Sequence, residues 1–404
     1  MRVTVIGLGY VGLPTAALLA SLGHEVQGVD SNPAVRAGLA AGRVHIAEPD
    51  IASLLEAALR EGRFTVHEAP PPAEVFVIAV PTPLGPDRAP VLDHVMTAAR
   101  ALASVLAEEN LVLLESTCPV GTTRALGALL RELRPELAAL RVAYTPERVL
   151  PGRILAELVE NDRVAGGLTP DCTAAALAFL RGFVRGRVSG TDAATAEMVK
   201  LAENSFRDVN VAFANEVSLI AQHHGLDAWE VIRLANRHPR VDILRPGPGV
   251  GGHCIAVDPW FLAHGAAGHA RVIPAARAVD VAKRADVLER ASALCVAGEE
   301  VTCLGLAFKA DVDDLRESPA LHIATELARR HPGLVRVVEP HLDAAPPGLD
   351  APLIGLEEAM AGNTALLLLT DHAAFRRIPP AALAGRRIID TRGIWAAPQE
   401  EEDA

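Results

Sequence analysis

The chain has 404 residues, 50% of them apolar, and a formal net charge of −12. This length allows two or three domains with separate cores, and the negative charge argues against nucleic acid or an anionic membrane as a partner, because either would require a basic face. No apolar run is long enough to span a membrane and the chain enters a strand directly at residue 2, so we expect a soluble, cytoplasmic protein.

The five cysteines are odd in number, widely scattered and without a Cys-x-x-Cys pair, so we expect neither a disulfide framework nor a bound metal. Cys254 stands near the end of residues 245–259, after four glycines and two prolines. Such a stretch forms a shaped loop that can pass close to a ligand, which is a usual way to present a nucleophile. The alternative is that Cys254 is a small buried apolar residue.

The first thirty residues have the order that a dinucleotide site requires. Apolar residues 2–7 form a strand, a G-x-G-x-x-G turn leads into an apolar helix that ends near residue 23, and a second strand at 25–29 ends on Asp30. The three glycines are Gly7, Gly9 and Gly12. Backbone N–H groups at the helix start suit a pyrophosphate, and Asp30 suits a ribose hydroxyl, so we predict a dinucleotide-binding site. The alternative is a tight turn without a ligand.

Nearly continuous apolar runs at 75–80, 111–115 and 141–144 predict further buried strands of a parallel sheet. Ligands of such sheets bind beyond the carboxyl ends of the strands. The candidates by position are Thr82, Thr117, Glu147 and Arg148. The threonines could instead be N-caps of the following helices.

A helix without Gly or Pro is predicted from Asp192, its N-cap, to residue 224, with Gly225 ending it. Five polar residues fall near one face: Lys200, Asn204, Arg207, Asp208 and Asn215. A polar stripe is usually a solvated face, but asparagine is a poor helix former and a solvated stripe would more naturally hold Glu and Lys pairs, so we do not expect this face to be solvated. A second amphipathic helix at about 274–297 would pack against it.

The last third returns to an α/β pattern. Strands are predicted at 300–305, 335–339, 365–369 and 387–390, and Ser318 is predicted to cap a helix that runs to residue 330. Between the first strand and this helix lie Phe308, Lys309 and Arg316. A ring beside two cations suits a nucleotide base and phosphates, although a surface loop of mixed charge is an equal alternative.

Together these pieces resemble the UDP-glucose/GDP-mannose dehydrogenase family, and within it the branch acting on UDP-N-acetyl-D-mannosamine. The resemblance covers nearly the whole chain. The motifs that carry it are VIGLGYVGLP at 5–14, PERVLPG at 146–152, KLAENSFRD at 200–208, NRHPR at 236–240, GGHC at 251–254 and GLAFK at 305–309.

The resemblance implies an α/β fold with two Rossmann-like three-layer domains joined by a central long-helix segment. The implied boundaries are an NAD domain at 1–190, a helical dimerisation segment at 191–297, a UDP-sugar domain at 298–398 and an acidic tail at 399–404. A homodimer through the central helices follows from the same resemblance.

The activity that the resemblance implies is a four-electron oxidation of the sugar C6 alcohol to a carboxylate with two NAD, for cell-surface polysaccharide synthesis. A cysteine thiolate captures the aldehyde as a thiohemiacetal, which becomes a thioester before hydrolysis. By similarity Cys254 is the nucleophile, Lys200 the acid/base partner and Asn204 an oxyanion donor. Asp258 organises water or the lysine, and Thr117 and Glu147 are the matching groups of the NAD domain.

The resemblance also assigns binding positions. Besides the three glycines, the cofactor positions are Tyr10, Val11, Asp30, Thr82, Thr117 and Arg316. The substrate positions are Arg148, Val149, Lys200, Asn204, Arg207, His238, Arg240, Gly249, Phe308 and Lys309. No metal is implied.

Two departures from the UDP-glucose branch favour an N-acetylated sugar. Pro151 stands where that branch has an acid, and Val257 stands directly before Asp258 where that branch has a lysine. The alternatives are the same chemistry on UDP-N-acetylglucosamine, UDP-glucose or GDP-mannose, and a non-catalytic protein that binds NAD and a nucleotide sugar.

Overall fold

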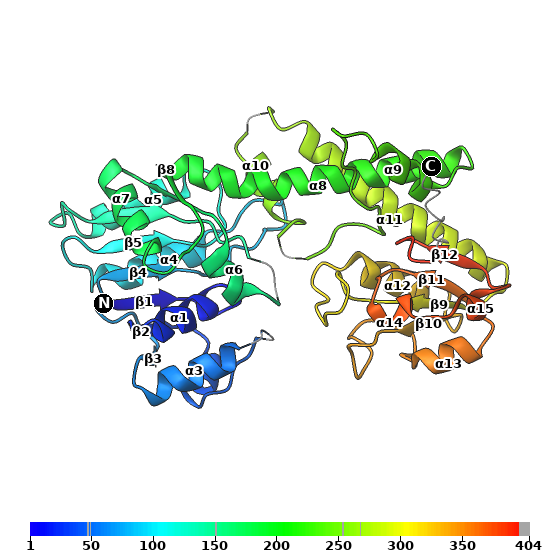
Figure 1. The fold of residues 1–404 in the computed structure, drawn as a ribbon, viewed down its shortest axis with the longest axis horizontal. Coiled ribbons are helices and arrows are strands. Elements are labelled where there is room, and N and C mark those ends of the chain that lie inside the picture. Colours follow the sequence, from blue (N-terminus) through cyan, green and yellow to red (C-terminus); the bar gives the residue numbers. More distant parts are fainter. Residues whose placement is uncertain (47, 49, 150–151, 253, 267, 396–404) are drawn as a thin grey trace. The chain divides into compact units, whose positions relative to one another are not determined.

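The computed structural model describes residues 1–46, 48, 50–149, 152–252, 254–266 and 268–395 (Figure 1). The chain divides into two compact units. Unit 1 contains Met1–Glu203 and Trp260–Gly265, and unit 2 contains Asn204–Pro259 and the residues from Ala266 onward. The predicted acidic tail, Pro151, His253 and part of the PERVLPG motif lie outside the described residues.

Unit 1 is built on an eight-stranded sheet with the order β3-β2-β1-β4-β5-β6-β7-β8. Its strands are β1 (Arg2–Ile6), β2 (Glu25–Val29), β3 (Phe64–His67), β4 (Val75–Ile78), β5 (Leu111–Leu114), β6 (Arg141–Tyr144), β7 (Arg163–Gly167) and β8 (Val188–Asp192). The sheet is parallel, as predicted, except that β6 and β7 pair antiparallel. The chain enters β7 from the edge at which β6 ends, so no crossover is needed there.

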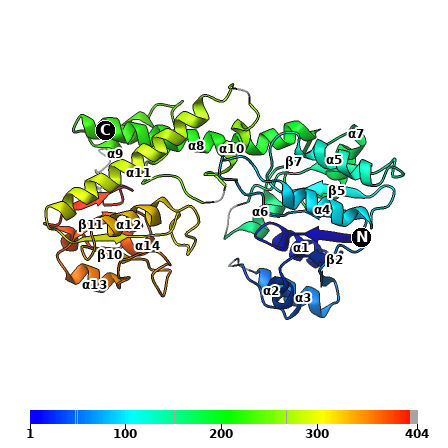
Figure 2. The same ribbon diagram turned by 180° about the vertical axis from the view of Figure 1, so that it is seen from behind.

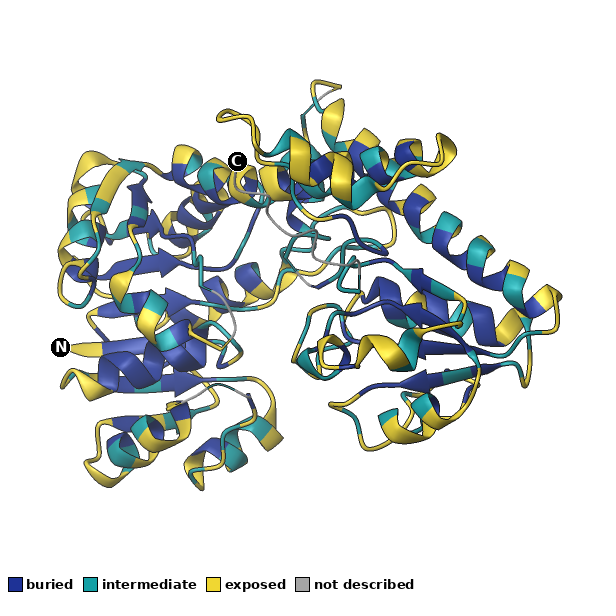
Figure 3. Cartoon of the chain, turned by 45° about the vertical axis from the view of Figure 1, so that its right-hand side comes forward, coloured by how far each residue is buried: buried dark blue, intermediate teal, exposed yellow. Residues whose placement is uncertain are grey.

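Helices cover both faces of this sheet. They are α1 (Gly12–Ser21), α2 (Pro33–Ala40), α3 (Ile51–Arg60), α4 (Asp93–Ala103), α5 (Thr122–Leu133), α6 (Ile154–Glu160) and α7 (Pro170–Leu180). Alternate residues of β4 enter two different cores: Val75 and Val77 pack with α1, α3 and α7, whereas Phe76 and Ile78 pack with α4 and α5. The strands are therefore buried on both faces, which explains their continuous apolar runs (Figure 3).

The long helix α8 (Ala193–His223) is confirmed, with the predicted cap and end. Asp192 accepts a hydrogen bond from the Thr195 N–H at 3.0 Å, and Gly225 follows with a φ of +70°. After it come α9 (Ala228–Ala235), α10 (Asp258–Ala263) and α11 (Val272–Val296). Lys283 of α11 donates to the Ser218 hydroxyl of α8 at 2.8 Å, so these two helices pack together as predicted.

Unit 2 contains a four-stranded parallel sheet with the order β10-β9-β11-β12. The strands are β9 (Val301–Leu304), β10 (Val335–Val338), β11 (Ala365–Leu368) and β12 (Ile388–Asp390), and the helices are α12 (Pro319–Arg330), α13 (Leu356–Ala361), α14 (Ala373–Arg376) and α15 (Pro380–Leu383). Helices α11 and α12 cover one face, while α13 and α14 cover the other (Figure 2). Ser318 caps α12 as predicted, accepting from the Leu321 N–H.

The predicted fold class is confirmed: two Rossmann-like three-layer domains with a long-helix segment between them in the chain. In each sheet the strand order reverses once, between β1 and β4 in unit 1 and between β9 and β11 in unit 2. Ligands of open α/β sheets bind outside the carboxyl ends of the strands at such a reversal. Within the described residues, no helix is long and apolar enough to cross a membrane.

Candidate functional site

The glycine turn after β1 has three glycines with three different structural tasks. Gly7 has a φ of +90°, and a Cβ there would lie 2.4 Å from the Ala79 carbonyl oxygen. A Cβ on Gly12 would lie 1.9 Å from the Gly7 oxygen, so this glycine lets α1 pack against the turn. A Cβ on the exposed Gly9 would meet no described atom within 4 Å. Gly9 therefore leaves the space over the start of α1 open, which fits the pyrophosphate of NAD.

Asp30 follows β2 and holds the same turn in place. One carboxylate oxygen accepts from the Leu8 N–H at 3.0 Å, and the other accepts from the Asn32 N–H at 2.8 Å. Each oxygen retains a lone pair that can accept a ribose hydroxyl. The carboxylate thus lies beside the glycine turn, as the sequence predicted.

Thr82 and Thr117 are joined at the carboxyl ends of β4 and β5. The Thr82 hydroxyl donates to the Thr117 carbonyl oxygen at 2.7 Å. The alternative that they are helix N-caps is wrong, since the caps of α4 and α5 are Leu92 and Gly121. The threonines are thus held at the strand ends rather than at the starts of helices.

Glu147 and Arg148 follow β6. The Glu147 carboxylate accepts from the Val149 N–H at 2.6 Å, and Arg148 donates to Glu203 of α8 at 2.6 Å and to the Asp162 carbonyl oxygen. These contacts fix the segment that carries the predicted substrate positions Arg148 and Val149.

Lys200 lies on α8 with only 8% of its surface exposed. One turn earlier, the fully buried Glu197 accepts from the Gly121 N–H, the Thr123 N–H and the Thr123 hydroxyl, each at 2.6 Å. Glu197 therefore fastens the start of α8 to the start of α5. Glu197 was not among the predicted site residues, although its spacing of three from Lys200 places it beside the polar stripe.

A second missed pair lies at the strand ends of unit 1. Glu115, which follows β5, accepts from Arg163 of β7 at 3.1 Å, and their side chains are 3% and 2% exposed. Burial raises the pKa of Glu115 to about 7 against the opposing effect of Arg163, and Glu147 raises it further.

Cys254 is the one cysteine of the five that is not buried, and all five lie among the described residues without a disulfide. Its carbonyl oxygen accepts from the N–H groups of Val257 at 3.0 Å and Asp258 at 2.8 Å, which forms the turn into α10. The Asn204 amide donates to the Asp258 carboxylate at 2.5 Å. Unit 2 thus brings Asn204, Cys254 and Asp258 together, and the interpretation of Cys254 as a core residue is wrong.

Residues of α8 and α11 hold the glycine loop before Cys254. The Asn215 side-chain oxygen accepts from the Gly247 N–H at 2.9 Å, and Asp280 accepts from the Val250 N–H at 2.6 Å. Gly249 has a φ of +142°, and a Cβ there would lie 3.0 Å from Pro319. The glycines therefore allow close packing as well as special φ values.

Four of the five residues of the polar stripe on α8 are buried or half-buried, and only Arg207 among them is exposed. Asp208 is fully buried and pairs with Arg277 of α11, and burial raises the pKa of Asp208 to about 6. The apolar residues Phe206 and Phe213 of the same helix are instead 72% and 50% exposed.

Several predicted substrate residues lie exposed. They are Arg207, His238, Arg240 and Lys309. Arg240 donates its backbone N–H to the His238 ring at 3.3 Å, which places these two side by side. Phe308 is half-buried, and its ring lies 2.9 Å from the position of a Cβ on Gly252. Arg316 pairs with Asp314, its neighbour in the same loop, at 2.5 Å.

One group of donor atoms in the described residues is compact enough for a metal ion: Asp311, His341 and His372, within 4.8 Å of one another. His372 Nδ1 already accepts the Asp311 N–H at 2.9 Å, however. Its lone pair is therefore engaged in a hydrogen bond, and we interpret the group as part of a hydrogen-bond network.

The fold and the glycine turn define a dinucleotide-binding α/β protein with a second Rossmann-like domain. Three domains of the UDP-glucose/GDP-mannose dehydrogenase family match the chain: the NAD binding domain at residues 1–183, the central domain at 194–282 and the UDP binding domain at 302–397. The chain therefore belongs to the UDP-glucose/GDP-mannose dehydrogenase family and is an NAD-dependent nucleotide-sugar dehydrogenase.

Among its relatives, an NDP-N-acetyl-D-galactosaminuronic acid dehydrogenase of Ralstonia nicotianae is 49% identical over 98% of this chain and 96% of its own. The UDP-N-acetyl-D-mannosamine dehydrogenase of Escherichia coli K12 is 46% identical over 97% of this chain and 99% of its own. The solved structure of a UDP-D-ManNAc dehydrogenase from Pyrococcus horikoshii matches with a TM-score of 0.88 and 39% identity, covering 98% of this chain and 96% of that one.

Proposed function

We propose that this enzyme oxidises UDP-N-acetyl-D-mannosamine at C6 to UDP-N-acetyl-D-mannosaminuronate for cell-surface polysaccharide synthesis, with two NAD consumed per sugar. The observation that carries the proposal is the cluster of Asn204, Cys254 and Asp258: the Asn204 amide donates to the Asp258 carboxylate, and the backbone of the half-buried Cys254 is hydrogen-bonded to the backbone of Asp258. This set suits covalent capture of an aldehyde better than a single hydride transfer.

The chemistry follows from these residue types. NAD supplies the hydride acceptor for both oxidations. The Cys254 thiolate adds to the aldehyde carbon, and the alkoxide takes a proton to give a thiohemiacetal. Loss of a hydride and a proton then gives a thioester, and water breaks the C–S bond to release the acid and the thiol. Lys200 is assigned the acid/base role by its match to the family motif, and Asn204 donates to the oxygen that gains charge.

The remaining roles are proposed from the match to the family's motifs. Asp258 orients the Asn204 amide and the water, and catalytic roles are also assigned to Thr117 and Glu147 as the matching groups of the NAD domain. Substrate contacts are assigned to Arg148, Val149, Arg207, His238, Arg240, Gly249, Phe308 and Lys309. Cofactor contacts are assigned to Gly7, Gly9, Tyr10, Val11, Gly12, Asp30, Thr82, Thr117 and Arg316.

A second candidate substrate, UDP-N-acetyl-D-galactosamine, is supported by one specific observation. The relative from Ralstonia nicotianae, whose name refers to N-acetyl-D-galactosaminuronic acid, is 49% identical to this chain, against 46% for the Escherichia coli relative. Both names refer to an N-acetylated amino sugar. We therefore propose that the site selects more strongly for the N-acetyl group than for the configuration of the sugar ring.

We further propose a homodimer through α8, with the domain divisions 1–190, 191–297 and 298–398. Phe206, Phe213 and Ile220 recur every seven residues along α8 and are 72%, 50% and 54% exposed. A stripe of large apolar side chains at this spacing forms one helix face and is typical of an interface between subunits. The proposed location is the cytoplasm, where NAD and nucleotide sugars are available.

The test is NADH formation with UDP-N-acetylmannosamine, UDP-N-acetylgalactosamine, UDP-N-acetylglucosamine, UDP-glucose and GDP-mannose. We expect two NADH per sugar, no released aldehyde, and the highest kcat/KM with the manno sugar. Cys254→Ser should retain NAD binding and lose acid formation. A uronic acid product from Cys254→Ser at near-normal rate would overturn the covalent mechanism, and a higher kcat/KM for another sugar would overturn the substrate.

A further inference from the structure

The loop between β9 and α12, residues 305–317, carries Phe308 and Lys309 but contains no helix or strand. Two of its non-glycine residues have left-handed backbone conformations, with φ of +59° at Asp311 and +49° at Glu317. Such conformations persist only where surrounding contacts impose them. Contacts with the rest of unit 2 must therefore stabilise this conformation of the loop.

A buried carboxylate holds the first residues of the loop. Glu339, at the end of β10, is 4% exposed, and its Oε2 accepts from the N–H groups of Leu306 at 2.7 Å and Ala307 at 3.1 Å. The other oxygen accepts from the His341 N–H at 3.2 Å. Asp30 holds the glycine turn of unit 1 in the same way, from the corresponding strand end.

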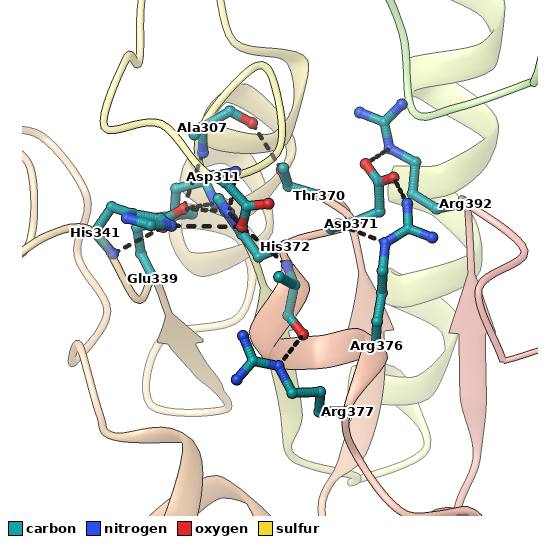
Figure 4. Close-up of polar contacts among 12 residues, drawn as sticks. Ala307, Asp311, Glu339, His341, Thr370, Asp371, His372, Arg376, Arg377 and Arg392 are labelled. Carbon is teal, nitrogen blue, oxygen red and sulfur yellow. Dashed lines mark hydrogen bonds and ion pairs between the residues drawn. The ribbon is translucent and has the colours of Figure 1, made fainter. Parts of the chain in front are cut away.

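His372 makes hydrogen bonds both to Glu339 and to the middle of the loop (Figure 4). It is fully buried, its Nδ1 accepts the Asp311 N–H at 2.9 Å, and its Nε2 lies 3.1 Å from Glu339 Oε2. Because Nδ1 accepts, the ring proton lies on Nε2, which donates to the carboxylate. One neutral imidazole therefore joins Glu339 to the strained Asp311.

Two neighbours of His372 add further contacts to the loop. The Thr370 hydroxyl donates to the Ala307 carbonyl oxygen at 2.7 Å, and the Ala373 N–H donates to the Asp311 carboxylate at 2.9 Å. Residues 370–373 follow β11, so the contacts lie where the strand order of unit 2 reverses. Sheets of this kind bind ligands at that place.

The far end of the loop contacts the glycine loop before Cys254. The Gly252 N–H donates to the Arg316 carbonyl oxygen at 3.1 Å. A Cβ on Gly252 would lie 2.9 Å from the Phe308 ring. Residues 305–317 thus contact both the side chains of His372 and Glu339 and the glycine loop before Cys254.

We propose that His372 is a positioning residue for substrate binding: oriented by Glu339, it holds Asp311 and so keeps residues 305–317 in the shape in which Phe308 and Lys309 meet the UDP part of the sugar nucleotide. This inference rests on the proposed function, in which those two residues contact the substrate. His372 itself touches no substrate.

Two substitutions separate the two hydrogen bonds of the ring. The side-chain oxygen of His372→Asn can occupy the position of Nδ1 and still accept the Asp311 N–H, whereas the amide of His372→Gln can reach the position of Nε2 and donate to Glu339 but cannot hold Asp311. The matched control is His341→Gln, a partly exposed neighbour whose Nε2 lies 3.8 Å from Asp311 Oδ1.

Binding of UDP to the full chain is measured by calorimetry, together with steady-state kinetics and hydrogen exchange of residues 305–317. For His372→Gln we expect at least about fivefold weaker UDP binding, a matching rise in KM for the UDP-sugar, faster exchange of the Asp311 amide and an unchanged KM for NAD. His372→Asn and His341→Gln should remain within about twofold of the wild type, because the bond to Asp311 is kept.

Equal UDP affinity in the wild type and His372→Gln would overturn the inference while leaving the proposed function in place. Equal losses in His372→Asn and His372→Gln would also overturn it, because the bond to Asp311 would then not be the one that matters. No UDP binding by the wild type would instead overturn the proposed function itself.

Discussion

Replacing Glu197 by Gln tests whether this buried carboxylate fastens α8 to unit 1. The carboxylate accepts three hydrogen bonds from the start of α5, at Gly121 and Thr123. An amide can keep its oxygen toward the two Thr123 donors, but its NH₂ group then faces the Gly121 N–H, which loses its acceptor. Hydrogen bonds to a charged group contribute about 1.5–3 kcal/mol each, and an unpaired buried donor carries a similar penalty.

We therefore expect Glu197→Gln to lower the free energy of unfolding of unit 1 by about 3 kcal/mol. For a domain of this size that corresponds to a fall in Tm of about 6–12 °C in scanning calorimetry. Lys200 lies one turn further along α8, so kcat should fall as well.

The control is Glu203→Gln on the same helix, which makes the same chemical change. The Glu203 side chain is 42% exposed and pairs with Arg148 at 2.6 Å. Exposed pairs contribute less than about 1 kcal/mol, so the control should lie close to the wild type in Tm. If Glu197→Gln and Glu203→Gln shifted Tm equally, the reasoning from buried hydrogen bonds would be refuted.

Four further predictions follow from the structure. Iodoacetamide should alkylate native Cys254 at least about tenfold faster than the four buried cysteines, because burial limits access and raises the pKa of Cys303, for example, to about 12. Comparable labelling of a buried cysteine in peptide mass spectrometry would contradict this. NAD should exceed NADP in kcat/KM by about 10² or more, because a 2′-phosphate would approach the Asp30 carboxylate; equal values would show that Asp30 does not face the ribose. The free energy of unfolding should fall by up to about 3 kcal/mol between pH 4.5 and about 7, because buried Glu115 keeps its proton in the folded protein while the unfolded chain loses it. In urea titrations Glu115→Gln should make this fall with pH smaller. An unchanged fall would mean that other groups cause it. Phe213→Glu should convert a dimer to monomers in light scattering, whereas a wild-type monomer would refute the interface.

The sequence by itself determined the features that depend on neighbours in the chain. The glycine turn with Asp30, the caps at Asp192 and Ser318 and the extent of α8 all follow from φ/ψ preferences, capping and periodicity over a few residues. The motifs that identify the family are also short and contiguous, so they could be read before any packing was known.

Only the tertiary structure decided which distant groups meet. Glu197 reaches Gly121 across 76 residues, Asn204 reaches Asp258 across 54, and His372 reaches Asp311 across 61. The sequence does not distinguish a buried Glu or His from an exposed one. Its neighbours in the chain do not determine from which backbone N–H it will accept a hydrogen bond. The polar stripe of α8 shows the same limit: periodicity placed its residues on one face, but burial of Asp208 against Arg277 depends on where α11 packs. Local preferences act within a few residues, whereas desolvation and hydrogen-bond pairing are set by the whole fold.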